Sequence, residues 1–190
     1  MTELAHRPWN AWRITRWTVA GTLLAVPALA MQVSDEVNWT VGDFVFAGVM
    51  IIGTALLYEA AVKLSGGWAY RTGVAVALTA AFLLIWVNLA VGVIGNEDDP
   101  HNAAYFCEVL LAAAAAFAAA FRPAGMSRAM LATGGFQLLI TALAAHGGWG
   151  ASEPPGFAGV LVLNLGFAGM WLLSAGLFWQ SVRRQAGSAP

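Results

Sequence analysis

The sequence predicts an all-α membrane protein, a polytopic bundle of about six transmembrane helices. Of its 190 residues, 59% are hydrophobic and only 10% are charged, against about 25% charged residues in an ordinary soluble domain. The apolar residues come in blocks of about the 20 residues that a helix needs to cross a bilayer. Inside hydrocarbon only helices or closed barrels satisfy the backbone, and these blocks lack the alternation of barrel strands. We therefore predict one helical transmembrane domain over 1–190.

Six apolar stretches define the predicted helices, and short polar segments separate them. The first stretch has an alternative reading, because Pro27 and Ala28-Leu29-Ala30 follow a basic segment as in a cleavable signal peptide. We expect it to be retained, since the apolar run continues to Val33 and reaches the lower limit for a span. Its removal would leave five helices. The predicted helices cover about 17–31, 41–64, 70–94, 103–121, 128–145 and 157–181.

The charged residues are divided between the two sides of this topology. All nine basic residues fall on one side, and the opposite loops carry only acids. Because Lys and Arg near helix ends mark the cytoplasmic side, we predict that both termini are cytoplasmic and that the membrane is a bacterial inner membrane. The basic residues are Arg7, Arg13, Arg16, Lys63, Arg71, Arg122, Arg128, Arg183 and Arg184, and the acids opposite are Asp35, Glu36, Asp43, Glu97, Asp98, Asp99 and Glu153.

Several classes of function find no support in the sequence. A single cysteine, Cys107, excludes an intrachain disulfide and a zinc site built on several cysteines. There is no basic stripe for nucleic acid, and no pair of histidines faces across the membrane to ligate a haem. No protease or phosphate-loop motif is present. We expect no cofactor, and as partners only the lipid bilayer and another membrane protein or a second copy of the chain.

Four polar residues lie well inside the predicted spans. They are Asn88, Glu108, Gln137 and Asn164, one on each of the last four helices. At about 1.5 Å of rise per residue, all four lie roughly 10 to 13 Å from the outer helix ends. A shared depth predicts a polar cluster. It could be a protonatable or cation-binding site, or a structural clasp in which Glu108 is neutral because burial disfavours its charged form.

The acidic loop between the third and fourth predicted helices is a weaker candidate site. Asp98, Asp99 and His101 lie within it, and His146 could approach from the next outer loop. Oxygen and imidazole groups of this kind bind divalent cations. The alternative is structural, because Asp99 can cap the fourth helix with Pro100 at its first position.

Small residues mark the predicted helix contacts. Alanine and glycine allow the close backbone approach by which membrane helices associate. Gly134 and Gly135 also suggest a gating hinge, as an alternative to packing. The small residues of interest are Ala112, Ala116, Ala120, Ala129, Gly134, Gly135, Gly166 and Gly169.

Two stretches carry a resemblance to known sequences. Asp35-Glu36-Val37-Asn38-Trp39-Thr40 with Asp43-Phe44, and Asn88-Leu89-Ala90-Val91-Gly92 through Ile94-Gly95-Asn96-Glu97-Asp98, resemble a group of small bacterial multi-pass inner-membrane proteins that are uncharacterised. The similarity covers about residues 35–125. It implies a multi-pass membrane fold and no activity or cofactor.

The functional hypotheses follow in order. The first is a small transporter-like protein built on Glu108 with Asn88, Gln137 and Asn164. The second is an accessory subunit of a larger membrane complex, because other buried polar groups are scarce. An intramembrane enzyme is third, since no nucleophile, base and orienting group can be placed together.

Overall fold

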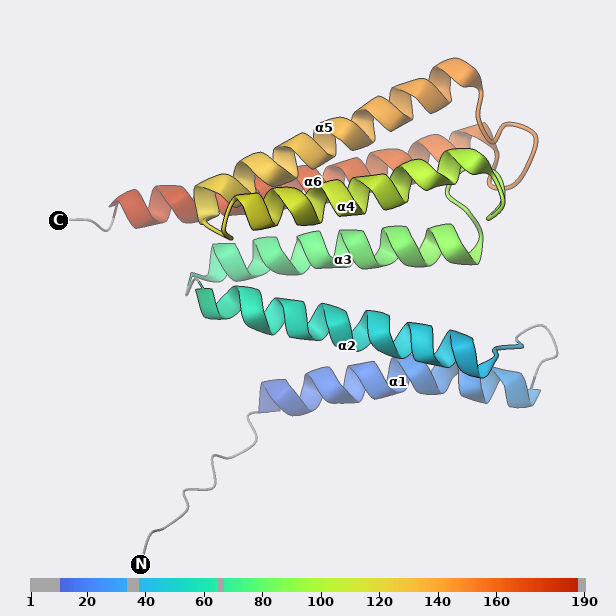
Figure 1. Cartoon of the computed structure of the whole chain (residues 1–190), viewed down its shortest axis with the longest axis horizontal. Helices are drawn as coiled ribbons and strands as arrows, with labels where there is room; N and C mark the ends of the chain where they lie inside the picture. Colours follow the sequence, from blue (N-terminus) through green and yellow to red (C-terminus); the bar gives the residue numbers. More distant parts are fainter. Residues whose placement is uncertain (1–10, 34–37, 65–66, 188–190) are drawn as a thin grey trace, which may run out of the picture. The chain divides into compact units, whose positions relative to one another are not determined.

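The fold was examined in a computed structural model that describes residues 11–33, 38–64 and 67–187. The regular structure of these residues is helical (Figure 1), which confirms the predicted fold class. Five helices are long and apolar enough to cross a membrane, whereas the apolar part of the first, Gly21–Val33, is shorter. The helices are α1 (Ala11–Val33), α2 (Val41–Leu64), α3 (Trp68–Ala90), a 3-10 turn η1 (Pro100–Asn102), α4 (Ala103–Ala118), α5 (Pro123–Gly147) and α6 (Gly156–Gly187).

The chain divides into two compact units, Met1–Leu57 and Tyr58–Pro190. In the first unit, α2 begins with a local cap. The side chain of Asp43 accepts hydrogen bonds from the backbone N–H of Thr40 at 2.7 Å and from its hydroxyl at 2.8 Å. This reciprocal arrangement satisfies donors that a helix start leaves open. Asp35 and Glu36 lie outside the described residues.

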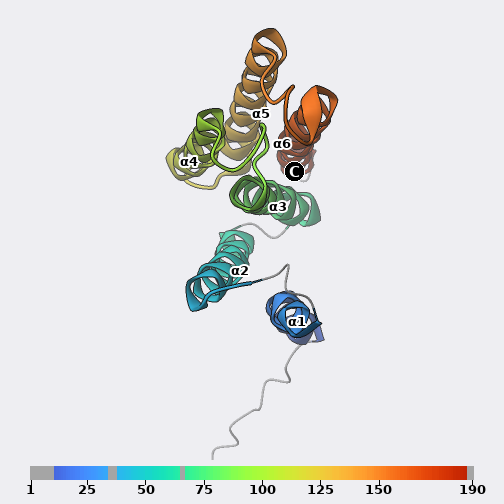
Figure 2. The same ribbon diagram turned by 90° about the vertical axis from the view of Figure 1, so that its right-hand side faces the viewer.

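The second unit contains helices α3 to α6, which run antiparallel (Figure 1) and lie together when viewed end-on (Figure 2). Helix α6 packs against both α5 and α3, and α4 packs against α5 and α3. This arrangement brings the α3–α4 and α5–α6 loops to one end, which we call the acidic end because it carries Glu97, Asp98, Asp99 and Glu153. The opposite end, called the basic end, carries the arginines of this unit. They are Arg71, Arg122, Arg128, Arg183 and Arg184.

Small residues bring the helices of this unit together. A Cβ atom on Gly73 of α3 would lie 3.3 Å from the ring of Phe178 on α6, and one on Gly134 of α5 would lie 3.0 Å from Leu172. Such close approach is how membrane helices gain packing without a hydrophobic driving force. Ala112, Ala116 and Ala129 are buried as expected, whereas Gly135, Gly166 and Gly169 are exposed with open space around them, and Ala120 is exposed in a turn. Helix α5 continues without a break through Gly134.

Helix α3 ends at Ala90, four residues before the predicted end at Ile94. Gly92 has a φ of 75°, a left-handed conformation that favours glycine. The side chain of Asn102 then accepts hydrogen bonds from the N–H groups of Val93 at 3.2 Å and of Ile94 at 3.0 Å. The apolar run therefore folds back over the bundle end as a buried loop, because a side chain supplies the partners that a helix would have supplied.

Helices α4 and α5 also differ from their predicted bounds. Helix α4 ends at Ala118, and Ala120 and Phe121 take positive φ values of 47° and 55°. Helix α5 begins earlier than predicted, at Pro123, because proline is well suited to the first turn of a helix. It ends before Gly148, whose φ of 63° forms a left-handed cap.

Candidate functional site

The candidate site is built around Glu108, which lies on the buried face of α4 with none of its surface exposed. Tyr105, Ala112 and Ala116 lie on the same face, at spacings of three and four residues. This face packs against α5 and α3. A carboxyl group on such a face must find hydrogen-bond partners within the protein, because hydrocarbon offers none.

Gln137 on α5 and Asn164 on α6 occupy the buried faces of their own helices and are also fully buried. The amide nitrogen of Gln137 donates to the amide oxygen of Asn164 at 2.8 Å. The hydroxyl of Tyr105 donates to the same oxygen at 2.9 Å. The amide nitrogen of Asn164 donates to the carbonyl of Val160 at 2.8 Å. These contacts, with Glu108 beside Gln137, form a polar network that joins α4, α5 and α6.

The hydrogen bonds of Asn164 favour one orientation of the Gln137 amide. The two ends of an amide have the same shape, so the partners decide which end is the oxygen. Asn164 must offer its oxygen to Gln137, because its nitrogen is committed to the carbonyl of Val160. The amide oxygen of Gln137 then faces Glu108, at 2.9 and 3.2 Å from the two carboxyl oxygens. A protonated Glu108 donates to that oxygen, and the network closes.

An ionised Glu108 would require a different set of hydrogen bonds. With the amide of Gln137 reversed, its nitrogen would donate to both carboxylate oxygens, at 2.9 and 3.2 Å. Its oxygen would then lie 2.8 Å from the amide oxygen of Asn164, and two acceptors would face each other. Relief requires Asn164 to turn as well and to give up the carbonyl of Val160. The proton on Glu108 therefore determines the bonding of side chains on three helices.

Trp171 of α6 is the second notable neighbour of Glu108. Its indole lies beside the carboxyl group, yet its buried Nε1–H makes no hydrogen bond of good geometry within the described chain. A buried donor without a partner is uncommon, and it is costly. Because the indole N–H adjoins the acid, it can serve as a donor when Glu108 changes its protonation state. Among these neighbours of Glu108, only Tyr105 on α4 has a side chain that can itself lose a proton, whereas Gln137 and Trp171 cannot.

Asn88 was expected in the same cluster, and the structure gives it a different partner. It is buried on α3, and its amide nitrogen donates to the backbone carbonyl of Asn102 at 2.9 Å. Its amide oxygen has no hydrogen-bond partner among the described residues. Asn102 also donates to the carbonyls of Ile94 at 3.0 Å and Asn96 at 2.6 Å. Asn88 therefore supports the α3–α4 loop, and it joins Asn102 instead of the network around Glu108.

The residues proposed for a metal site have structural partners in the described loop. Asp99 caps η1 by accepting from the backbone N–H of His101 at 2.9 Å, as the capping hypothesis predicts. The ring of His101 bonds the same carboxyl at 2.7 Å and stacks on Trp149 at 3.9 Å. Asp98 and His146 are exposed. Within residues 11–33, 38–64 and 67–187, no three His, Cys, Asp or Glu side chains gather closely enough to hold a metal ion.

Tyr105 and Trp171 are parts of the site that sequence reasoning did not assign to it. Tyr105 precedes Glu108 by three residues and so shares its helix face, a spacing that could have identified it. A tyrosine near a helix start is also typical of the membrane interface, and that reading conceals its role. The indole N–H of a buried tryptophan such as Trp171 usually needs a partner, but sequence spacing does not relate α6 to α4. Their proximity appears only when the helices are packed.

Comparison with known proteins adds no relative. No family model, curated protein or solved structure matches the chain. The functional interpretation therefore rests on the geometry of the described residues.

Proposed function

We propose that the chain is a small transporter-like membrane protein in which Glu108 takes up and releases a proton. The observation that carries the proposal is the contact of the buried Gln137 amide with the buried Glu108 carboxyl, at 2.9 and 3.2 Å. The network around it closes only with the proton on the acid. Ionisable groups inside membrane spans are costly and commonly mark proton relays and ion pathways, which supports a functional role beyond packing.

Proton loss would alter the contacts between helices. The bonds from Gln137 to Asn164 and from Tyr105 to Asn164 hold α5 and α4 to α6. Reversing the Gln137 amide changes both sets, so protonated and ionised forms favour different packings of these helices. A transporter needs two packings whose balance a bound ion can shift. We also propose that the basic end faces the cytoplasm of a bacterium, because basic residues mark that side of an inner membrane.

An accessory subunit of a larger membrane complex is the second candidate. Other polar side chains between the helices favour this candidate, because their hydrogen bonds only hold neighbouring helices together. Ser174 of α6, for example, donates to the carbonyl of Gly73 on α3 at 2.8 Å, and Ser127 of α5 donates to that of Ala175 at 2.9 Å. On this reading Glu108 is a clasp and its proton never leaves. An intramembrane enzyme is the third candidate, because the described contacts of Glu108 are with Gln137 and Trp171, whose side chains are not nucleophiles.

The test is infrared spectroscopy of the reconstituted protein. The carbonyl stretch of a protonated carboxyl group lies apart from the amide bands, and Glu108→Gln identifies the part that belongs to Glu108. We expect that the band is present at neutral pH, shifts when the vesicles are transferred to D₂O, and disappears as the external pH is raised. Glu97→Gln is the matched control, because it removes an exposed acid and leaves the network intact.

A band that neither exchanges with D₂O nor responds to pH would contradict the transporter proposal and favour the clasp. No Glu108 band at any pH would contradict the protonated network itself. Purification from native membrane distinguishes the accessory-subunit role from the transporter role, because a stable partner in fixed stoichiometry would support the subunit role.

A further inference from the structure

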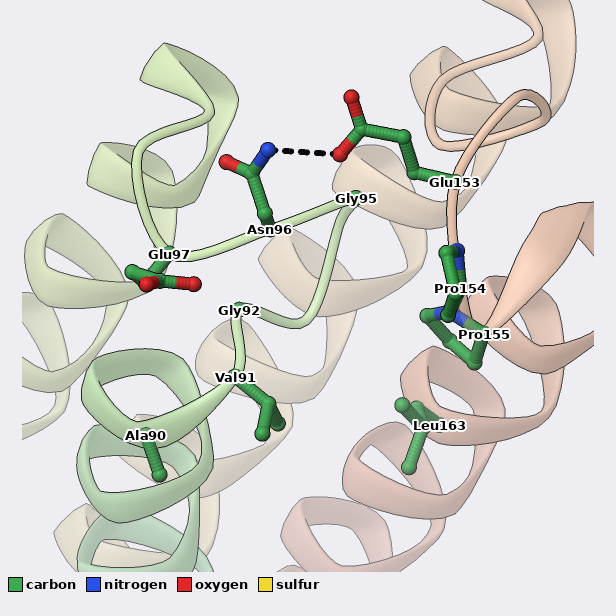
Figure 3. A pocket seen from close by; sticks show the side chains of 10 residues that line it. All are labelled: Ala90, Val91, Gly92, Gly95, Asn96, Glu97, Glu153, Pro154, Pro155 and Leu163. Carbon is green, nitrogen blue, oxygen red and sulfur yellow. Dashed lines mark hydrogen bonds between the residues drawn. The ribbon is translucent and has the colours of Figure 1, made fainter. Parts of the chain in front are cut away.

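A groove of about 380 Å³ opens at the acidic end, between the α3–α4 loop and the α5–α6 loop (Figure 3). Its size lies within the range of small-molecule sites, about 300 to 1,000 Å³. None of the residues of the Glu108 network lines this groove. The lining residues are Ala90, Val91, Gly92, Gly95, Asn96, Glu97, Glu153, Pro154, Pro155 and Leu163.

One hydrogen bond joins the two loops of the groove, and others order the α3–α4 loop. The amide nitrogen of Asn96 donates to the carboxyl of Glu153 at 2.6 Å across the opening. The amide oxygen of Asn96 accepts from the backbone N–H of Asp98 at 3.0 Å. The backbone carbonyl of Asn96 accepts from Asn102, which holds the rest of the loop. A site whose walls are already ordered loses less conformational entropy when a ligand binds.

The lining combines negative charge with an apolar surface. Glu97 and Glu153 are the charged residues of the lining, and no lysine, arginine or histidine is among them. One oxygen of Glu153 accepts from Asn96, and the other has no hydrogen bond to the residues drawn in Figure 3. Val91, Leu163 and the two prolines supply the apolar part. A ligand that matches both features has a positive charge and an apolar body.

We propose that this groove binds a free organic monocation, such as an alkyl- or arylalkylammonium ion. The carboxylates pair with the cationic group, and Val91 and Leu163 contact the apolar body. An inorganic cation would leave the apolar surface without a partner, and an anion would be repelled by both acids. The proposal does not rest on proton exchange at Glu108, because the groove is complete without that residue.

The probe is benzyltrimethylammonium, titrated calorimetrically into the full chain in uncharged maltoside micelles. Benzylsulfonate is the matched ligand, since it has a similar apolar body and the opposite charge. We expect saturable binding of the cation and none of the anion. Equal binding of both ligands would show that charge is not recognised and would overturn the proposal.

Two variants with the same change in net charge test the position of the site. Glu153→Gln removes a charge from the lining but keeps an oxygen that can accept from Asn96. Asp98→Asn removes a charge from the same loop system but lies outside the lining. We expect Glu153→Gln to weaken binding roughly fivefold, as for a solvent-exposed charge pair, and Asp98→Asn to leave it nearly unchanged. Equal weakening by the two variants would assign the effect to general surface charge and overturn the proposal.

Two further measurements separate the remaining alternatives. Val91→Ala should weaken binding roughly threefold, through lost apolar contact, and no loss would remove the apolar body from the proposal. Displacement of the probe by phosphatidylcholine would assign the groove to a lipid headgroup and overturn the claim for a free ligand. Glu108→Gln should leave probe binding intact. Retained binding with a Glu108 band that does not titrate would contradict only the proposed function, whereas a titrating band without probe binding would contradict only the groove.

Discussion

The hydrogen bonds at the basic end of the bundle differ from those around Glu108 in what accepts them. At the basic end, side-chain donors reach backbone carbonyls: Tyr70 donates to the carbonyl of Phe121 at 2.8 Å, and Ser174 donates to that of Gly73 at 2.8 Å. Around Glu108 the contacts between helices join one side chain to another. Both regions are buried, and both link helices that are distant in sequence.

This difference determines which region can respond to a proton. A carbonyl oxygen can only accept, so a bond from a hydroxyl to a carbonyl has one direction. A side-chain amide offers a donor and an acceptor, and a carboxyl group changes from donor to acceptor when it ionises. The bonds at the basic end are therefore fixed, whereas those around Glu108 can reverse. The two regions are buried to a similar extent, but only the hydrogen bonds around Glu108 can change direction when a proton is gained or lost.

The largest expected effect follows from Gln137→Met, which keeps a long side chain and removes the amide. Glu108 would lose its amide partner and be left unpaired, whereas the amide oxygen of Asn164 would keep the hydrogen bond from Tyr105. Because unpaired buried polar groups are costly, the free energy of unfolding should fall by about 2 kcal/mol. Denaturation in mixed detergent micelles measures it. An unchanged free energy would show that Gln137 does not join Glu108 to Asn164.

Ser174→Ala tests the fixed region. The variant removes one buried hydrogen bond between α6 and α3, so it should lower the free energy of unfolding by about 1 kcal/mol. The same loss is expected at every pH, because neither the hydroxyl nor the carbonyl of Gly73 titrates. A loss that varied with pH, relative to wild type, would remove the distinction between the two regions.

The sequence predicts the depth of the network better than its membership. Glu108, Gln137 and Asn164 were expected at one depth from helix rise alone, and the structure brings them together. Asn88 shares that depth, but its partner belongs to a loop that folds back over the helix end. The fold of this loop depends on side-chain bonds from Asn102, which periodicity does not encode.

The helix ends show the same limit. Hydrophobicity alone extends α3 to Ile94, because a buried loop is as apolar as a helix. Gly92 is the local signal for the earlier end, and its left-handed φ of 75° marks where the chain turns. The helical class and the membrane-length helices need no such detail, since composition and the length of the apolar blocks determine them.

A smaller effect is expected for Tyr105→Phe, which removes one of the two donors to the amide oxygen of Asn164. Gln137 continues to donate to that oxygen at 2.8 Å, so no acceptor is left unpaired. The free energy of unfolding should fall by about 0.6 kcal/mol, the average for hydrogen bonds between membrane helices. A loss as large as that of Gln137→Met would show that Tyr105 is the principal link between α4 and α6.

The melting temperature of wild type and Glu108→Gln, measured against pH, tests the responsive network most directly. In the variant, the new amide can donate to the oxygen of Gln137 as the protonated acid does, so the two proteins should match at low pH. As pH rises through the range in which a free carboxyl ionises, the unfolded wild type releases a proton that the folded network retains. The stability of the wild type should therefore fall below that of the variant until folded Glu108 also loses its proton. Groups common to both proteins cancel in the difference. A difference that stays constant over the whole pH range would contradict a protonated Glu108 in the folded network, whereas a difference that keeps growing to the highest pH would leave Glu108 as a fixed clasp.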